Sequence, residues 1–393
     1  MRNKIRNIGL FNDSFPPVMD GVAICVENYA RWMQECVGGV SVITPENRDA
    51  DYSYKKYEVL TYTSVAVPFR PPYVTGISDL DPAFKTRLMR RQFRIVHAHC
   101  PFTSGWAAQN IAKKQRIPMV ATFHSKYRDD FARLISSDII LDAVIKGIVR
   151  FYESADEVWV PQESVKDVLY SYGYKGNIEV MQNGCDLVGD YSPEFFTEAR
   201  RSLGVADGEL VLLYVGQHIW EKNLRLTIET LARVKDLPYR MFFVGTGYAE
   251  DEMKKMVEEK GLGNKVRFVG RLTDRKKLTQ YYAASDLFLF PSLYDTDGLV
   301  VREAAALHTP SIMLRNASAA GMLKDGETGF LIGNTADDFE AAIRSLHADR
   351  SRLETVGLNA STSIVRSWKD IAEEAIDRYN ALINRVKLIH PLD

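Results

Sequence analysis

The sequence predicts an α/β protein made of two Rossmann-like, doubly wound domains. Short apolar runs alternate with longer amphipathic stretches, a pattern typical of β-α units on a parallel sheet. The chain has 393 residues, more than one compact domain usually contains. The alternation also restarts near the middle of the chain, which indicates two halves of similar construction.

The first half opens with an apolar run and a turn-rich loop. We predict a strand at residues 5–11, a loop that contains Pro16, Pro17 and Gly21, and a helix at about 22–36. Further strands are predicted at residues 39–44, 95–98, 118–123 and 157–161, and further helices at 105–115 and 138–154. Each strand is short and apolar, as expected where both faces of a sheet are covered.

The second half repeats the pattern from residue 209. Strands are predicted at 209–215, 240–244, 266–269, 287–290 and 310–314, with a helix that begins near Asn223. The polar, turn-rich residues 189–193 are a candidate hinge. We therefore predict domains at 1–188 and 189–367. A C-terminal segment, 368–393, holds a last amphipathic helix that can pack back on the N-terminal domain.

Composition excludes several classes of partner. Lys and Arg number 50 against 51 Asp and Glu, so no overall charge attracts nucleic acid. The four cysteines are scattered without a C-x-x-C pair, which fits a reducing compartment. The N-terminus has no apolar stretch typical of a signal sequence, and no segment approaches the roughly 20 apolar residues that span a bilayer. The sequence predicts a cytoplasmic protein that does not bind nucleic acid.

One stretch, residues 290–306, combines the features of a phosphate-binding loop. An apolar strand ends at Phe290, a loop runs to Gly298, and a helix is expected from Leu299. Backbone N–H groups at a helix start can cradle a diphosphate. Asp295 and Glu303 can accept hydrogen bonds from sugar and ribose hydroxyls. The alternative is an ordinary helix start with solvated acids, one of which caps it.

This stretch resembles the E-x7-E signature of retaining GT-B glycosyltransferases of family GT4, the glycosyl transferases group 1, with Asp295 where the family has Glu. The resemblance implies two Rossmann-like domains that face each other across a cleft. It implies that Glu303 binds the nucleotide ribose and that Asp295 lies near the donor sugar. Asp297, Gly298 and Leu299 are then expected at the donor diphosphate.

Other blocks of the second half resemble the family in order. Residues 214–224 match its Y-V-G-R-x-x-x-E-K-N-L block. The match implies that Gly216 and Lys222 contact the diphosphate and that Gln217 stands where the family has Arg. A neutral amide supplies no positive charge to the leaving group. The further donor-site residues that the resemblance implies are Gly245, in a G-x-G turn, and Gly270 and Arg271, whose backbone faces the base. Gly321 replaces a Glu that the family usually has nearby.

The first half is expected to hold the acceptor. Residues 13–23 resemble the family's first loop, in which Gly21 would let backbone N–H groups approach the donor phosphate. Residues 122–125 resemble its T-x-H block, which implies that His124 lies near the reacting sugar. His97 and His99 point the same way along one strand. We interpret these two histidines as structural or acceptor-side residues rather than metal ligands.

Three alternatives stay open. Asp295 and Asp297 form a D-x-D that could hold a divalent metal. The chain could be a catalytically degenerate subunit that binds a nucleotide sugar. A nicotinamide oxidoreductase is disfavoured because no strand leads into G-x-G-x-x-G.

The prediction is a metal-independent, retaining hexosyltransferase without a cofactor, in which His124, Lys222 and Asp295 are the catalytic residues. Its donor is a nucleotide diphosphate sugar, and its acceptor is a glycan, a lipid or a small molecule. A basic stretch could also contact the inner face of a membrane, or simply be a solvated helix face. It contains Lys85, Arg87, Arg90, Arg91 and Arg94. The nearby segment 69–73 adds the aromatic residues Phe69 and Tyr73.

Overall fold

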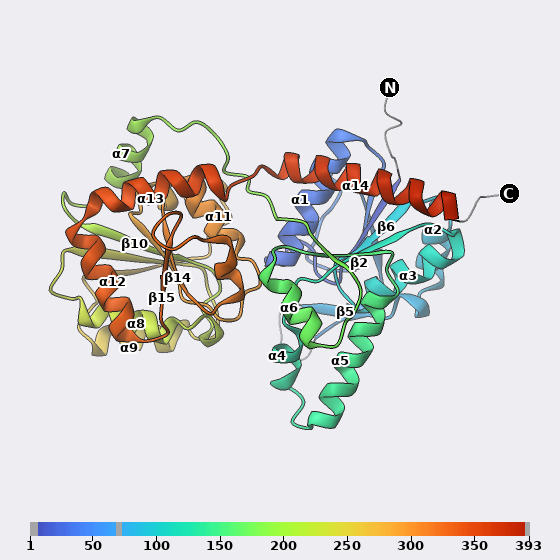
Figure 1. The fold of residues 1–393 in the computed structure, drawn as a ribbon, viewed down its shortest axis with the longest axis horizontal. Coiled ribbons are helices and arrows are strands. Elements are labelled where there is room, and N and C mark those ends of the chain that lie inside the picture. Colours follow the sequence, from blue (N-terminus) through green and yellow to red (C-terminus); the bar gives the residue numbers. More distant parts are fainter. Residues whose placement is uncertain (1–6, 68–72, 390–393) are drawn as a thin grey trace. The chain divides into compact units, whose positions relative to one another are not determined.

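A computed structural model describes residues 7–67 and 73–389, which form two compact units (Figure 1). Unit 1 comprises residues 1–183 and 368–393, and unit 2 comprises 184–367. The chain therefore enters unit 2 after Asn183, not after residue 188 as predicted. The physical reason is a short pairing inside unit 2, where the Cys185 N–H donates to the Arg366 carbonyl at 2.8 Å. This bond joins the beginning of unit 2 to its end.

Unit 1 is built on a seven-stranded parallel sheet of order β3-β2-β1-β6-β7-β8-β9. Its strands are β1 (Ile8–Phe11), β2 (Val40–Pro45), β3 (Glu58–Tyr62), β6 (Ile95–Ala98), β7 (Met119–Thr122), β8 (Glu157–Val160) and β9 (Ile178–Val180). A separate antiparallel pair joins β4 (Ser64–Ala66) and β5 (Val74–Gly76). The sequence did not predict β3 or β9, which are short and only partly buried edge strands. Residues 5 and 6 of the first predicted strand lie outside the described residues.

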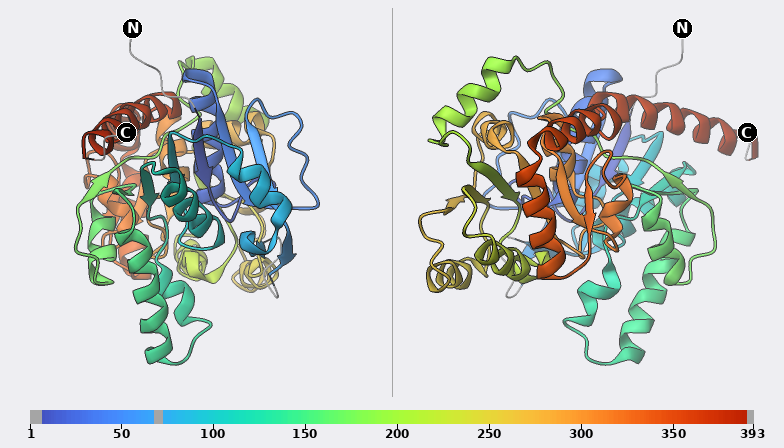
Figure 2. Two further views of the ribbon diagram at one scale, coloured as in Figure 1. Left: turned by 90° about the vertical axis from the view of Figure 1, so that its right-hand side faces the viewer. Right: turned by 60° about the vertical axis from the view of Figure 1, so that its left-hand side comes forward.

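Helices cover the sheet of unit 1 and also extend beyond it. They are α1 (Gly21–Cys36), α2 (Pro82–Met89), α3 (Thr103–Gln115), α4 (Tyr127–Ala132), α5 (Asp138–Glu153), α6 (Ser164–Ser171) and α14 (Trp368–Ile389). Figures 1 and 2 show α14 alongside α1, with α4 and α5 extending away from the sheet. Tyr379 of α14 stacks on Trp159 of β8 and lies 2.5 Å from His97 Nδ1. The final helix is thus part of unit 1, although it is last in the sequence.

Unit 2 is a second parallel sheet, of order β12-β11-β10-β13-β14-β15. Its strands are β10 (Leu210–Val215), β11 (Tyr239–Val244), β12 (Val266–Gly270), β13 (Leu287–Phe290), β14 (Ser311–Leu314) and β15 (Phe330–Ile332). Strands β10, β13 and β14 are buried along their whole length, which explains their continuous apolar sequences.

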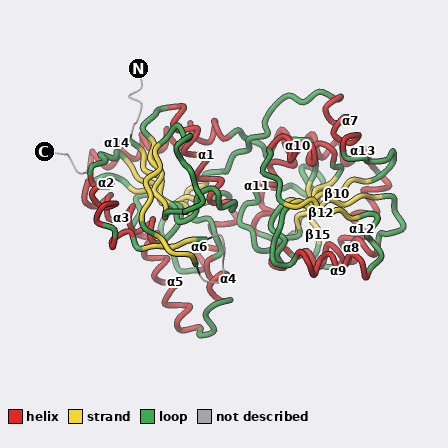
Figure 3. Tube along the Cα trace, turned by 180° about the vertical axis from the view of Figure 1, so that it is seen from behind, coloured by secondary structure: helices red, strands yellow, loops and turns green. Residues whose placement is uncertain are grey.

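The helices of unit 2 lie on both faces of its sheet. They are α7 (Pro193–Ser202), α8 (Leu224–Arg233), α9 (Glu250–Glu259), α10 (Arg275–Ala284), α11 (Leu299–Ala306), α12 (Ala336–Ala348) and α13 (Arg350–Ser363). Figure 3 shows α8, α9 and α12 on one face and α10, α11 and α13 on the other. Helix α7 begins at Pro193, the last residue of the predicted hinge, and this hinge lies in the first residues of unit 2.

In each sheet, the strands that follow the first strand are added on one side of it and then on the other. The place where the order changes is the switch point of the sheet. In unit 1 this point lies between β1 and β6, and in unit 2 between β10 and β13. Loops that leave the two strands diverge there, so the carboxyl ends of these strands border a crevice in which doubly wound proteins bind ligands. The fold therefore directs attention to the loops after β1, β6, β10 and β13.

Across the described ranges 7–67 and 73–389, no helix is both long and apolar enough to cross a membrane.

Candidate active site

The switch point of unit 2 brings together two of the residues predicted to be catalytic. Strands β10 and β13 pair directly, so the loops that follow them are neighbours. Lys222 ends the short 3₁₀ helix η2 (Trp220–Lys222) after β10, and Asp295 lies in the loop after β13. Lys222 Nζ donates to Asp295 Oδ1 at 2.5 Å, and the two side chains are 12% and 21% exposed. This partly buried ion pair is the centre of the candidate site.

The second oxygen of Asp295 has a different environment. Oδ2 is buried and has no hydrogen-bond partner among the residues that the structure describes. Buried carboxylate oxygens are normally paired, because an unpaired one loses its hydration without compensation. The backbone N–H of Tyr294 donates to the Ser292 hydroxyl at 3.2 Å and holds this loop in place. Asp295 therefore offers an acceptor that suits a ligand hydroxyl.

Glu303 is held by two groups that the sequence did not reveal. Arg275 Nη2 donates to its Oε1 at 2.7 Å, and the Tyr282 hydroxyl donates to its Oε2 at 2.8 Å. A carboxylate can accept about four hydrogen bonds, so capacity for a ribose hydroxyl remains. Arg275 begins α10 just after its N-cap, and no local spacing links it to Glu303. Arg275 and Glu303 meet because α10 packs beside α11.

Asp297 lies in a buried ion pair rather than at an open donor surface. Asp297 and Arg302 are 5% and 2% exposed, and Arg302 Nη2 donates to Asp297 Oδ1 at 3.1 Å. Arg302 also donates to the Ile364 carbonyl at 2.7 Å. A buried carboxylate needs a cationic partner. The pairing of Asp297 with Arg302 therefore holds the preceding loop against the start of α11. Both carboxylates of the D-x-D thus face a cation of the protein, Lys222 or Arg302.

Two of the predicted donor-site glycines also have a packing role. A Cβ at Gly245 would lie 1.9 Å from the Gly216 carbonyl oxygen, and Gly245 has φ +135°. The Gly245 N–H donates to the Gly270 carbonyl at 2.9 Å. These contacts hold the ends of β10, β11 and β12 close together. Packing within unit 2 therefore requires glycine at 245 whether or not a ligand is bound.

The remaining predicted donor residues surround the same edge of the sheet. Gln217 is exposed, and its carbonyl accepts from the Tyr214 hydroxyl at 2.9 Å. Arg271 follows the last residue of β12 and is exposed. Gly298, with φ +84°, forms the N-cap that starts α11 at Leu299. The predicted residues of unit 2 thus lie at the carboxyl edge of its sheet, in the loops, in the first turns of the helices that follow, or, for Gly270, at the end of β12.

Gly21, by contrast, has no packing role in unit 1. It is the first residue of α1, and a Cβ there would meet nothing within 4 Å. The carboxylate of Asp20 caps this helix by accepting from the Ala23 N–H at 2.7 Å. Nothing inside unit 1 explains a glycine here, which is consistent with the expected approach of a ligand.

His97, His99 and His124 of unit 1 form a buried chain at the ends of β6 and β7. His99 Nδ1 lies 3.0 Å from His124 Nε2, and His97 Nε2 lies 2.6 Å from the Thr122 hydroxyl. Burial lowers the pKa of His124 to about 3 and lowers the pKa of His97 and His99 well below 6.5. All three imidazoles are therefore neutral near pH 7. His124 can exchange hydrogen bonds with a sugar hydroxyl but carries no charge.

Two of the five cations of the predicted basic face are paired with acids. Lys85 pairs with Asp79 at 3.1 Å, Arg91 pairs with Glu58, and Arg87 donates to the Thr61 carbonyl. Residues 68–72, which include most of the aromatic segment, lie outside the described residues.

Comparisons with known proteins agree with this architecture. The model "Glycosyl transferases group 1" matches residues 195–362, and the model "Glycosyltransferase Family 4" matches residues 19–188. The chain is 27% identical over 351 residues to the alpha-monoglucosyldiacylglycerol synthase of Streptococcus pneumoniae, covering 87% of this chain and 78% of that protein. It is 26% identical to the sulfoquinovosyl transferase SQD2 of Arabidopsis thaliana, covering 90% of this chain and 69% of that protein.

Solved structures show the same fold. The sucrose-phosphate synthase of Thermosynechococcus elongatus matches with a TM-score of 0.82 and 22% identity over 97% of this chain and 100% of that one. HepE of Anabaena, solved with UDP and glucose, matches with a TM-score of 0.77 and 18% identity over 96% of this chain and 100% of that one.

Two doubly wound domains that match such structures over almost the whole chain define the GT-B fold. The protein belongs to the GT4-type glycosyltransferases, the family of glycosyl transferases group 1. It is an enzyme that transfers a sugar from a nucleotide sugar to an acceptor.

Proposed function

We propose that the protein is a retaining, metal-independent hexosyltransferase that uses a nucleoside diphosphate sugar. The observation that carries the proposal is the Lys222–Asp295 pair at the switch point of unit 2, with Asp295 Oδ2 buried and unpaired. The Lys222 ammonium suits a departing diphosphate, and Asp295 Oδ2 suits a sugar hydroxyl. Their contact in one site supports a reaction at the bond that joins sugar to phosphate.

Lys222 changes partner in the proposed reaction. Its ammonium pairs with Asp295 in the structure described here and turns to the donor diphosphate when the donor binds. Released from part of this pairing, Asp295 accepts from sugar hydroxyls, while Glu303 accepts from the ribose. Stabilising the charge that develops on a leaving group is the largest contribution that such a site can make.

The reaction proceeds at one face of the sugar. The bond from the anomeric carbon to the diphosphate oxygen breaks, and a bond from that carbon to the acceptor oxygen forms on the same side. The departing diphosphate oxygen takes the proton of the acceptor hydroxyl. His124 orders the sugar through a neutral hydrogen bond, and backbone N–H groups at Gly21 and at the start of α11 bind phosphate oxygens.

Metal independence is supported by the partners of the D-x-D carboxylates. Asp295 and Asp297 face Lys222 and Arg302, so the charge that a divalent ion would neutralise is already compensated. We propose that no cofactor takes part and that Lys222 performs the electrostatic role of a metal.

The names of similar proteins suggest which substrates to test first. HepE was solved with UDP and glucose, and the synthase of S. pneumoniae is named for a glucosylated diacylglycerol. We propose a UDP-hexose as donor and a lipid hydroxyl as the first acceptor to test, followed by glycans and small molecules.

A cytoplasmic enzyme that touches the inner membrane face would reach such a lipid. Three exposed apolar side chains at the α4–α5 connection suit this contact, namely Leu134, Ile139 and Ile140, at 66%, 83% and 56% exposure. They lie at the end of the pair that extends from unit 1 in Figure 1. They suit a lipid surface better than Lys85 on α2, which is paired with Asp79.

The second candidate is a degenerate subunit that binds a nucleotide sugar without transferring it. The chain departs from the family pattern at three donor-site positions. It has Gln217 in place of Arg, Asp295 in place of Glu and Gly321 in place of Glu. Slow hydrolysis of the donor, followed by nucleotide release, would favour the enzyme. Substitution Gln217→Arg is expected to raise this rate if weak leaving-group stabilisation limits it.

A thermal-shift screen of UDP, GDP, ADP and their common sugars, with and without EDTA, tests the proposal. We expect one nucleotide to raise the melting temperature equally in both conditions. NMR of the product would then show the anomeric configuration. A shift abolished by EDTA would contradict metal independence. Nucleotide binding without turnover of any sugar would support the degenerate subunit.

A further inference from the structure

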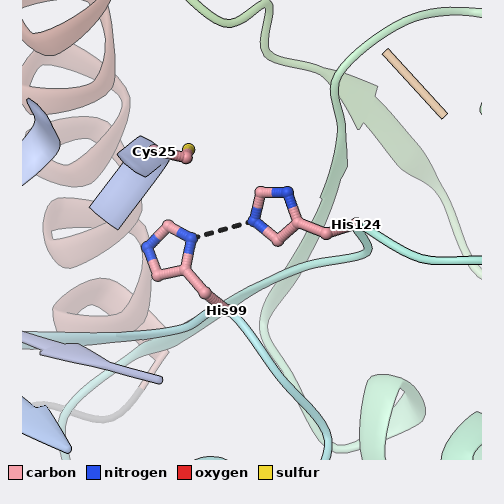
Figure 4. Close-up of side chains that lie close together, drawn as sticks. All are labelled: Cys25, His99 and His124. Carbon is pink, nitrogen blue, oxygen red and sulfur yellow. Dashed lines mark hydrogen bonds between the residues drawn. The ribbon is translucent and has the colours of Figure 1, made fainter. Parts of the chain in front are cut away.

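Unit 1 contains a group of metal-ligating side chains that the proposed reaction does not require as a group. It consists of Cys25 on α1, His99 after β6 and His124 after β7, and all three are buried. One ligand atom from each residue lies within 4.8 Å of the others. Figure 4 shows the Cys25 sulfur pointing toward the two rings. In the part of the chain that the structure describes, no other three or more His, Cys, Asp or Glu residues meet in this way.

The fold produces this group by bringing three elements to one switch point. Strands β1 and β6 are paired, as are β6 and β7, so the residues after β6 and β7 lie side by side. Helix α1 begins after the β1 loop, and Cys25 lies in its first turns. No spacing in the sequence reveals the group, because Cys25 and His99 are separated by 74 positions.

The donor set suits a borderline-soft divalent ion. Two imidazoles and one thiol provide N, N and S ligands, which Zn²⁺ binds in tetrahedral geometry. The three side chains are buried and their ligand atoms lie close together, so they can converge on one ion. The site has three protein ligands, and the fourth position would hold a water molecule.

The distances are close to those that a tetrahedral ion needs. His99 Nδ1 and His124 Nε2 are 3.0 Å apart. Zn–N bonds of about 2.05 Å at a tetrahedral angle require about 3.3 Å, and a nitrogen and a sulfur require about 3.5 Å. Small side-chain rotations therefore suffice to separate the two rings and to bring Cys25 Sγ closer.

We propose that Cys25, His99 and His124 form a binding site for Zn²⁺, and that Zn²⁺ inhibits the enzyme when bound there. The inhibitory part rests on the proposed function, because it assumes that His124 contacts the sugar. An ion on His124 Nε2 fixes the orientation of this ring and places a positive charge beside the sugar. The binding part rests on unit 1 alone.

Binding requires two changes of protonation. Either His99 Nδ1 or His124 Nε2 carries the proton of their hydrogen bond, and this proton must move to the other nitrogen of the same ring. The Cys25 thiol donates to Asn183 Oδ1 at 3.2 Å, and its proton passes to water when the sulfur coordinates the ion. Rotation of the Asn183 amide would then present its NH₂ group to the thiolate.

Titration of the full-length, reduced protein with Co²⁺ tests the site. We expect one Co²⁺ per chain, with intense visible absorption from tetrahedral coordination and a thiolate-to-cobalt band in the near ultraviolet. Zn²⁺ should displace both signals. Cys25→Ser should abolish the thiolate band, and His99→Gln should weaken Co²⁺ binding by at least about tenfold.

Cys36→Ser is the matched control. Cys36 lies on the same helix but outside the group, so this variant should retain the full spectrum. Circular dichroism and melting temperature establish that Cys25→Ser is folded, and Cys25→Ala provides a second variant. An unchanged thiolate band in Cys25→Ser, or no tetrahedral spectrum in the wild type, would overturn the site.

Activity tests the inhibitory part separately. Zn²⁺ should inhibit the wild type, and EDTA should restore its activity, whereas Cys25→Ser should keep its basal activity and resist Zn²⁺. Inhibition that is equal in both proteins would overturn this part. Because the Co²⁺ spectrum does not depend on turnover, failure of the proposed transferase function would leave the binding result intact.

Discussion

At the residue scale, Lys222 is the cationic side chain that stabilises the leaving group in the proposed reaction. It extends from the loop after β10 to Asp295 at the switch point and is only 12% exposed. Gln217 occupies the position at which the family pattern has a second cation. The proposed reaction therefore depends on Lys222 more than it would in a site with an Arg–Lys pair.

Substitution Lys222→Ala is expected to lower kcat by about 100- to 1,000-fold, because it removes one charged donor from the transition state. Steady-state kinetics with the donor found in the nucleotide screen measures the loss. Lys255→Ala is the control, since Lys255 is 74% exposed on α9. Equal activity of Lys222→Ala and the wild type would contradict the assignment.

Asp295→Asn separates sugar recognition from nucleotide binding. The amide removes the charge that pairs with Lys222 and leaves an NH₂ or a neutral oxygen near the donor sugar. We expect kcat to fall by about 10- to 100-fold, while the Kd of the free nucleoside diphosphate is unchanged or lower because Lys222 is released. Calorimetry and kinetics measure the two quantities, with Asp251→Asn on α9 as control. Weaker nucleotide binding would contradict the assignment.

At the element scale, two predicted donor-site glycines differ in what requires them. Gly245 packs against the Gly216 carbonyl, whereas the space around Gly21 is open. The first glycine therefore belongs to the packing of unit 2, and the second is explained better by a ligand. Substitutions that add one methyl group distinguish these roles.

Gly245→Ala is expected to destabilise the protein by about 2–5 kcal/mol, because the methyl group overlaps a backbone oxygen and φ +135° is strained for alanine. Gly263→Ala should change stability by less than about 0.5 kcal/mol, since nothing lies within 4 Å of a Cβ there. Urea unfolding measures both. A stable Gly245→Ala variant would show that the loops after β10 and β11 move apart easily.

Gly21→Ala should leave the unfolding free energy within about 0.5 kcal/mol of the wild type, because no atom opposes the methyl group. It should nevertheless lower kcat/KM, since a Cβ at the start of α1 obstructs the approach of backbone N–H groups to phosphate. Urea unfolding and initial rates measure the two effects. Full activity in this variant would exclude the proposed phosphate contact.

At the scale of the whole molecule, the last helix completes the first unit. Tyr379 on α14 is fully buried, stacks on Trp159 and lies within hydrogen-bond distance of His97. The chain therefore crosses between units twice, after Asn183 and again before Trp368. Unit 1 is complete only after the whole chain has been synthesised.

Tyr379→Phe is expected to lower the unfolding free energy of unit 1 by about 1–3 kcal/mol, because His97 Nδ1 is left buried without its partner. Tyr170→Phe is the control, since Tyr170 is 43% exposed. Hydrogen exchange in β6 and α14 reports the loss locally. No change in exchange would mean that packing alone holds α14 in place.

Sequence patterns predicted much of the fold. Short apolar runs identified strands such as β1, β10 and β13, because a strand covered on both faces must be apolar throughout. The same local patterns missed β3 and β9, whose partly buried edge positions leave a weaker signal. They also placed the domain change at residue 188, because a polar, turn-rich segment looks like a hinge wherever it lies.

The sequence by itself determined the two parallel sheets, the family, and the segments that carry Lys222, Asp295 and Glu303. These features depend on residues close together in the chain, so periodicity and spacing encode them. The tertiary structure alone decided which groups become partners: Arg275 with Glu303, Tyr379 with His97, and Cys25 with His99 and His124. These partners meet because strand order and helix packing bring distant residues to one edge of a sheet, and no local pattern records that order.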